Sequence, residues 1–203
     1  MVLLELANGP ACSFLDSGSV PEDGALTAAF AALFRRGLIQ REGDGFVLSD
    51  SGRMFDSLRN APRAVYVSDG TGNIALCYLA EDALWLVDLA DVVVATQYRV
   101  RRLDRAGLER WLFDSGLLEP PMLTDGDVRE LEAWIDSPEQ SDVRPLLRLE
   151  RHVNGGAADG VYEVYKYRSH RRISWNGRDT YYTRETLSDM LTDCFGKENY
   201  DHR

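Results

Sequence analysis

The apolar residues between positions 26 and 58 follow first a helical spacing and then an alternating one. Leu26, Phe30 and Phe34 recur at the interval of one helix face, which predicts an amphipathic helix. Two short strands then flank the turn Glu42-Gly43-Asp44-Gly45, because glycine and aspartate accept the positive φ of a tight hairpin. A helix followed by such a two-stranded wing is typical of a winged-helix unit.

A second helical pattern follows the wing directly. Met54, Phe55 and Leu58 share one face of it, and Ser49 precedes it. Because a serine hydroxyl accepts from the free N–H groups at a helix start, we expect Ser49 to cap this helix. Residues 1–49 are therefore predicted to form a winged-helix-like helix and hairpin that packs on the segment after it.

From residue 64 the apolar spacing changes to a period of two in residues that favour strands, which predicts an antiparallel meander. Its expected strands are residues 64–67, 74–79, 83–88 and 92–100. Asp104 then precedes another helical pattern that ends near Gly116, and its carboxylate suits the N-terminal cap of that helix.

The same order of elements begins again after Pro120-Pro121. A helix is expected to start at Thr124 or Asp125, and strands are expected at residues 145–153, 161–167, 171–175 and 178–182. Asn176-Gly177 predicts a type I′ hairpin turn between the last two strands. Thr183 is expected to cap a final helix that ends at Gly196.

The repeated order predicts an α+β protein built from two similar halves, each a helix, an antiparallel meander and a helix, related by a pseudo-twofold axis. The first half is residues 50–118, the second is residues 124–196, and residues 197–203 form a tail. The sequence leaves open whether the two halves share one sheet.

Composition narrows the class of partner. The net charge of −10 argues against nucleic acid, because phosphate contacts need a basic surface. The three cysteines are far apart in sequence, which indicates neither a disulfide framework nor a metal cluster and suits the cytoplasm. Cys77 and Cys194 fall at apolar positions and are expected in the core. No apolar run approaches the length of a membrane span.

The sequence contains no recognisable arrangement for catalysis. His152, His170 and His202 lack the spacing of a metal site, and no nucleophile motif accompanies them. The glycine-rich segment 69–73 joins two strands and lacks the lysine of a phosphate loop, so it reads as a hairpin turn. We therefore expect a protein that is not an enzyme and has neither a cofactor nor a bound metal.

A basic and aromatic stretch between residues 165 and 178 is the strongest candidate for a binding surface. Arginine and aromatic side chains are enriched at protein interfaces. The alternative is a strand pair whose aromatic residues face the core and whose arginines protect an exposed edge. The residues proposed to contact a partner are Tyr165, Lys166, Tyr167, Arg168, Arg171, Arg172 and Trp175.

The chain resembles the EspG-like group of type VII secretion accessory proteins. The resemblance lies in the helix and wing at residues 26–48, in the meander RAVYVSDGTGNIALCYLAEDALWLVDL at residues 63–89, and in the helices at residues 104–115 and 183–195. It implies a bacterial, cytosolic chaperone with a pseudo-twofold α+β fold that keeps secretion substrates soluble. It carries over no catalytic or binding residue.

Three functions follow as hypotheses. The first is a non-enzymatic cytosolic adaptor or chaperone whose partner is another protein, such as a small helical type VII secretion substrate. The second is a winged-helix transcription regulator, although the helix before the wing offers few side chains suited to reading DNA. The third, an enzyme with a site between the halves, has no residues behind it. The sequence is also compatible with a homodimer.

Overall fold

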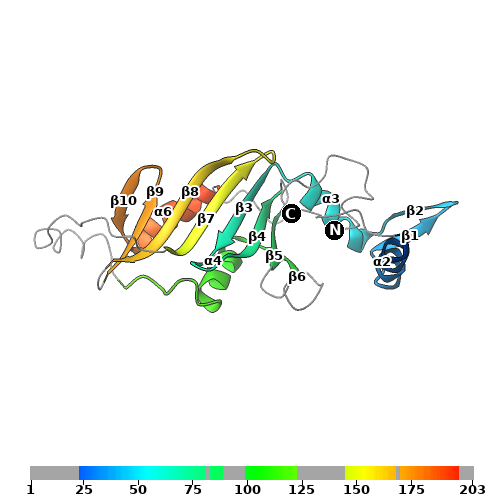
Figure 1. The fold of residues 1–203 in the computed structure, drawn as a ribbon, viewed down its shortest axis with the longest axis horizontal. Helices are drawn as coiled ribbons and strands as arrows, with labels where there is room; N and C mark the ends of the chain where they lie inside the picture. Colours follow the sequence, from blue (N-terminus) through cyan, green and yellow to red (C-terminus); the bar gives the residue numbers. More distant parts are fainter. Residues whose placement is uncertain (1–22, 81–82, 89–98, 123–144, 168–169, 197–203) are drawn as a thin grey trace, which may run out of the picture. The chain divides into compact units, whose positions relative to one another are not determined.

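The structure, a computed structural model, divides the chain into two compact units. It describes residues 23–80, 83–88, 99–122, 145–167 and 170–196 (Figure 1). Among these, the first unit holds residues 23–62 and Ala80, and the second holds residues 63–79 and those from 83 onward. The helix expected from Thr124 or Asp125 and the tail at 197–203 lie outside the described residues.

The first unit contains the predicted helix and hairpin. Its elements are α2 (Asp23–Arg35), β1 (Ile39–Glu42), β2 (Gly45–Leu48), the 3-10 turn η1 (Asp50–Gly52) and α3 (Met54–Arg59). Strands β1 and β2 pair antiparallel from Ile39↔Leu48 to Glu42↔Gly45. Gly43 has φ +59° in the turn between them, a conformation that glycine adopts without strain.

The expected role of Ser49 needs correction. Its Oγ accepts from the Gly52 N–H at 3.2 Å and so caps η1, whereas α3 begins after Arg53 and has no side-chain cap. The extra turn forms because Gly52 lies against the Leu38 backbone, where a Cβ would come within 2.0 Å of the Leu38 carbonyl oxygen. This contact keeps the chain in a tight turn before the helix can start.

The second unit is a single antiparallel sheet. Eight strands lie within the described residues, in the order β10-β9-β8-β7-β3-β4-β5-β6. The strands are β3 (Arg63–Ser68), β4 (Asn73–Leu79), β5 (Leu84–Asp88), β6 (Arg99–Leu103), β7 (Pro145–Val153), β8 (Ala158–Tyr167), β9 (His170–Trp175) and β10 (Arg178–Tyr181). The two expected meanders therefore share one sheet, joined by the antiparallel pair β3–β7 that runs from Arg63↔Val153 to Ser68↔Arg148. The α+β class is confirmed.

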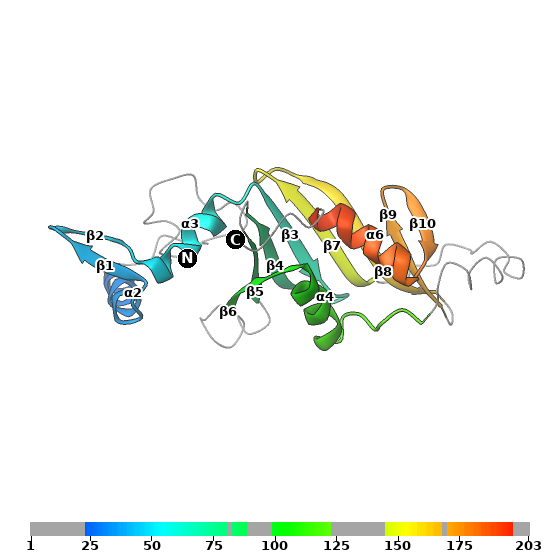
Figure 2. The same ribbon diagram turned by 180° about the vertical axis from the view of Figure 1, so that it is seen from behind.

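Two helices, α4 (Arg105–Asp114) and α6 (Arg184–Phe195), lie on the same face of this sheet, as Figure 2 shows. Alternate strand residues and the apolar side of each helix form the core between them. Cys77 and Cys194 are both buried there, as expected. None of the described helices is long and apolar enough to cross a membrane.

The caps predicted at Asp104 and Thr183 and the Asn-Gly turn are confirmed. The Asp104 carboxylate accepts from the Gly107 N–H at 2.6 Å at the start of α4, and Thr183 forms a capping box with Thr186 at the start of α6. Asn176 and Gly177 have φ +49° and +71°, the positive values of a type I′ turn.

One strand differs from its expected position. The structure has β6 at Arg99–Leu103, whereas the sequence predicted a strand over 92–100, most of which lies outside the described residues. Pairing with β5 explains the extension, because Leu103 lies opposite Leu84 and Arg99 opposite Asp88. The sheet thus includes arginines that the apolar pattern placed beyond the strand.

Candidate functional site

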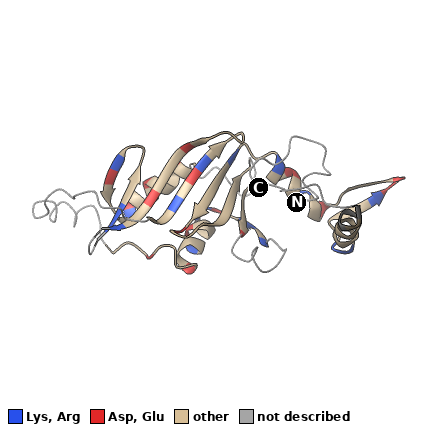
Figure 3. Ribbon diagram, viewed as in Figure 1, with Lys and Arg blue, Asp and Glu red and all other residues tan. Residues whose placement is uncertain are grey.

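The face of the sheet opposite α4 and α6, here called the outer face, carries half-buried polar residues on β3 and β7–β10. The side chains of β7 alternate between the two faces of the sheet, so every second residue of this strand belongs to the outer face. Leu147 and Leu149 are buried on the helix side, so Arg148, Glu150 and His152 point to the outer face. Figure 3 shows acidic and basic residues together on β7, β8 and β10.

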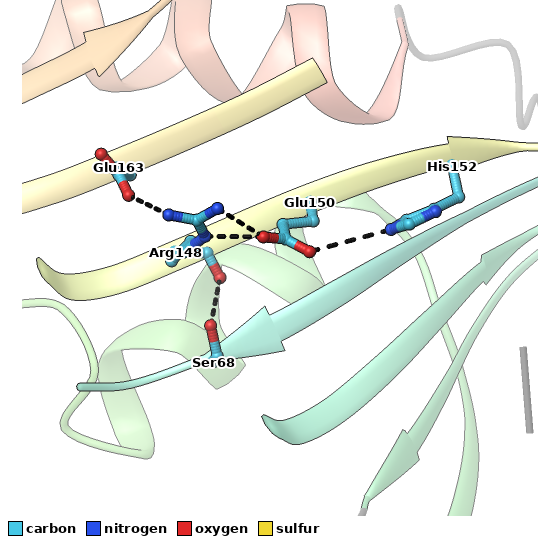
Figure 4. A network of polar contacts seen from close by, with 5 residues as sticks. All are labelled: Ser68, Arg148, Glu150, His152 and Glu163. Atoms are coloured by element: carbon cyan, nitrogen blue, oxygen red, sulfur yellow. Dashed lines mark hydrogen bonds and ion pairs between the residues drawn. The ribbon is translucent and has the colours of Figure 1, made fainter. Parts of the chain in front are cut away.

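Arg148 is the centre of an outer-face network formed by Ser68, Arg148, Glu150, His152 and Glu163 (Figure 4). Its Nε and Nη2 donate to Glu150 Oε1 at 2.7 and 2.6 Å, and its Nη1 donates to Glu163 Oε1 at 2.7 Å. The hydrogen bond to Glu150 is the main reason why the pKa of Arg148 is raised. The guanidinium therefore stays charged and fixes one carboxylate from its own strand and one from β8.

His152 extends this network toward β3. Its Nδ1 lies 2.9 Å from the Gly156 carbonyl oxygen, and its Nε2 lies 3.9 Å from Glu150 Oε2. Because a carbonyl oxygen only accepts, Nδ1 carries the proton and Nε2 faces the carboxylate. The Tyr66 ring contacts the imidazole edge-to-face, with a centroid distance of 5.1 Å.

A second group on this face, the outer-face cluster, contains Tyr165, Arg172, Asp179 and Tyr181. Arg172 Nε donates to Asp179 Oδ1 at 3.0 Å, and its guanidinium lies 5.0 Å from the centroid of the Tyr181 ring. Burial, with a hydrogen bond to Asp179, raises the pKa of Tyr165 to about 12. The Tyr165 hydroxyl therefore remains a neutral hydrogen-bonding group at neutral pH.

The residues predicted to contact a partner lie on both faces of the sheet. Tyr165 and Arg172 are cross-strand neighbours on the outer face, and the register then puts Lys166 and Arg171 on the helix side. Arg171 pairs with Glu119 at 2.7 Å, and Lys166 is exposed.

The remaining three predicted residues differ in how far the structure describes them. Trp175 is only 9% exposed and belongs to the core under α6. Tyr167 is part of β8 by its backbone, and Arg168 lies outside the described residues. The sequence stretch thus contributes Tyr165 and Arg172 to the outer face, while Trp175 anchors the hairpin.

Sequence reasoning missed the network around Arg148. The signal was present in PLLRLERHV, because a period of two places Arg148, Glu150 and His152 on one side of the strand. Glu163 could not be added without knowing that it lies opposite Arg148 in the pairing of β7 with β8. The sequence pattern predicts which side chains of a strand share a face, but it does not predict which strand lies next to it.

The outer face combines fixed charges with an exposed apolar side chain. Val161 lies opposite Glu150, on the same face as the network, and is 36% exposed. In the part of the chain that the structure describes, no group of three or more histidine, cysteine or acidic side chains could hold a metal ion. The arrangement offers directed hydrogen-bonding groups beside apolar contact area, a combination suited to binding another protein.

The chain matches no protein-family model, and neither a curated protein nor a solved structure shows significant similarity to it.

Proposed function

We propose that the protein is a non-enzymatic, cytosolic adaptor or chaperone that binds another protein on the outer face of β7–β10. The observation that carries the proposal is the outer-face network and cluster beside the exposed Val161. Ion-paired arginines and tyrosines whose positions are already fixed lose little conformational freedom on binding. Arginine and tyrosine are also the residues that most often dominate interface energies.

Tyr165 and Arg172 are the proposed contacts at the centre of this surface. Arg172 is held between Asp179 and the Tyr181 ring and its side chain is only 12% exposed, so a partner would meet a small and rigidly held part of it. Lys166, Tyr167, Arg168 and Arg171 are proposed as further contacts for a partner that reaches past the outer face, because Lys166 and Arg171 project from the helix side. Trp175 supports them from the core.

The proposal also includes a pseudo-twofold relation between the two halves of the fold. The proposed partner is a small helical type VII secretion substrate, and the proposed activity is that of an EspG-like chaperone in a bacterial cytoplasm. The strand order supports the pseudo-twofold relation, because each direction from the β3–β7 pair passes through a meander that ends at an edge. A capped helix, α4 or α6, follows each meander.

Co-expression with small helical proteins encoded beside its gene tests the function. We expect a complex that survives size-exclusion chromatography, and loss of that complex in the double variant Y165A/R172A. Arg110→Ala, at an exposed position of α4, is the matched control and should leave the complex intact. A wild-type protein that elutes alone with every such partner would refute the adaptor function.

The alternative is a winged-helix DNA-binding regulator with a C-terminal sensing or dimerising unit. The hairpin β1–β2 directly after α2, with exposed Arg35, Arg36 and Arg41, favours it. A duplex-DNA mobility shift that weakens steeply with salt, and is lost on changing Arg36 and Arg41 to alanine, would support this function over the first.

A further inference from the structure

The first unit exposes two aromatic rings that contact each other. The Phe46 ring of β2 packs edge-to-face on Phe30 and Phe34 of α2, with centroid distances of 4.8 and 5.9 Å. Phe34 and Phe46 are nevertheless 50% and 49% exposed. Single apolar side chains are common on protein surfaces, whereas contacting ones form a patch of the kind found at interaction sites. Phe30, Phe34 and Phe46 are here called the aromatic patch.

Basic side chains flank the aromatic patch. Arg41 lies opposite Phe46 in the pairing of β1 with β2, so both side chains project from the face of the hairpin that meets α2. The acid that follows, Glu42, projects from the other face. Arg35 and Arg36 come directly after the exposed ring of α2, and all three arginines are exposed. The patch therefore has positive charge beside it on both the helix and the hairpin.

These arginines have no acidic partner within the part of the chain that the structure describes. Arg35 Nε donates to the Ala31 carbonyl oxygen at 3.3 Å, and Arg41 Nε donates to the Gly43 carbonyl oxygen at 3.2 Å. Both bonds use only Nε, so the two Nη groups of each guanidinium remain available to a carboxylate.

Solubility alone does not explain this arrangement. Acids would keep the exposed rings soluble at least as well as arginines do. The chain has 33 acidic and 23 basic residues, yet the charges flanking the patch are basic. Duplex DNA would pair with the arginines, but its phosphate backbone is polar and would leave the rings exposed. A partner that presents apolar and acidic side chains on one surface matches both features.

We propose that the aromatic patch binds an acidic, amphipathic helix of a partner protein. The inference rests on the proposed protein-binding function and adds to it a second surface, in the first unit. Side chains four positions apart on a helix are about 5–6 Å from each other, and the centroids of Phe34 and Phe46 are 5.9 Å apart. Two such apolar side chains can therefore each contact one ring. Acids on the flanks of the helix then pair with Arg35, Arg36 and Arg41.

Fluorescence anisotropy with the full chain and labelled, end-capped peptides tests the proposal. The peptide Ala-Glu-Leu-Glu-Ala-Leu-Leu-Glu-Ala-Leu-Glu-Ala-Glu-Leu has, as a helix, a leucine face with glutamates along both sides. The permuted peptide Glu-Ala-Glu-Ala-Leu-Glu-Ala-Leu-Glu-Leu-Leu-Ala-Leu-Glu has the same composition and charge but spreads its leucines around the helix. We expect it to bind at least fivefold more weakly. The first peptide with proline as its ninth residue cannot continue the helix and should bind at least tenfold more weakly.

Variants locate the site on the protein. Phe34→Ser should weaken binding of the first peptide at least tenfold. Val47→Ser changes an exposed apolar side chain on the other face of the hairpin and should alter binding less than twofold. The double variant Q40R/R41Q keeps the composition and charge of the chain but moves one arginine to that other face, and we expect it to weaken binding at least threefold. Circular dichroism checks that each variant folds.

Three results would overturn the proposal. The first is equal binding of the leucine-face peptide and either of the other two, or an unchanged affinity in Phe34→Ser or in Q40R/R41Q. The second is a chain that binds no peptide but shifts duplex DNA through Arg36 and Arg41, which would favour the DNA-binding alternative. The third is a chain that excludes the peptide because it dimerises through the same rings, which would make a second copy the occupant.

The two proposals fail separately. If the peptide does not bind although the chain co-purifies with a protein partner, the aromatic-patch proposal is overturned and the adaptor function stands. If no protein partner forms a complex, the adaptor function falls whatever the peptide does.

Discussion

Replacing Arg148 by methionine tests whether the outer-face network acts as a unit. Methionine keeps most of the aliphatic stem of the side chain and removes the guanidinium that holds Glu150 and Glu163. The two carboxylates would then lie on neighbouring strands without the cation between them. We expect the second unit to lose stability.

The burial of the network sets the size of the loss. The side chains of Arg148, Glu150 and Glu163 are 40%, 33% and 29% exposed, so these pairs are neither fully solvated nor fully buried. Breaking an exposed pair costs about 0.2–1 kcal/mol, and breaking a buried one costs about 3–5 kcal/mol. Because water still screens this site, we expect the free energy of unfolding to fall by about 1–2 kcal/mol in total, which is closer to the cost for exposed pairs than to that for buried pairs.

Urea unfolding followed by tryptophan fluorescence measures this loss, since Trp85, Trp111 and Trp175 all belong to the second unit. Arg110→Ala, an exposed arginine on α4, is the control and should change the free energy of unfolding by less than about 0.5 kcal/mol. Adding Glu150→Gln to the Arg148→Met variant should recover part of the loss, because it removes one of the two unpaired charges. A loss no larger than that of the control would refute the idea that the three side chains are coupled.

Three further changes test the fold and its electrostatics. Gly52→Ala should destabilise the first unit by several kcal/mol, because the added Cβ would lie 2.0 Å from the Leu38 carbonyl oxygen; circular dichroism of the variant would show this, and a native melting curve would contradict it. Thr183→Ala removes the cap of α6 and should lower the free energy of unfolding by about 1 kcal/mol in urea, whereas Thr183→Ser should retain most of it. Burial raises the pKa of the Cys77 thiol and of the Tyr182 hydroxyl, so the folded chain holds protons that the unfolded chain releases in alkali. Stability should therefore be complete below about pH 8.5 and decline above it, and a urea midpoint that stays constant up to pH 10.5 would disagree.

The basic and aromatic hairpin shows where sequence reasoning reached its limit. Interleaved arginines and aromatic residues between positions 165 and 178 suggested one continuous surface. The pairing of β8 with β9 instead puts Tyr165 and Arg172 on one face of the sheet and Trp175 in the core beneath the other. Composition describes a stretch of chain, whereas a strand divides that stretch between two environments.

Local signals in the sequence were sufficient for most elements of this protein. The caps at Asp104 and Thr183 and the turn at Asn176-Gly177 depend on hydrogen bonds or dihedral angles within a few residues, so the sequence predicts them directly. Ser49 was different, because the turn that it caps depends on Gly52 lying against Leu38, a contact across the wing.

Only the tertiary structure decided which strands are neighbours. The β3–β7 pair joins residues 63–68 to residues 148–153, and a single sequence contains no signal for a contact over that separation. That pairing merges two meanders into one sheet and places Ser68 beside Arg148. The β5–β6 pairing likewise made Arg99–Leu103 the last of the described strands on its side of the sheet, which the apolar pattern alone did not indicate. Sequence periodicity determines which way a side chain points, and the fold determines what it meets.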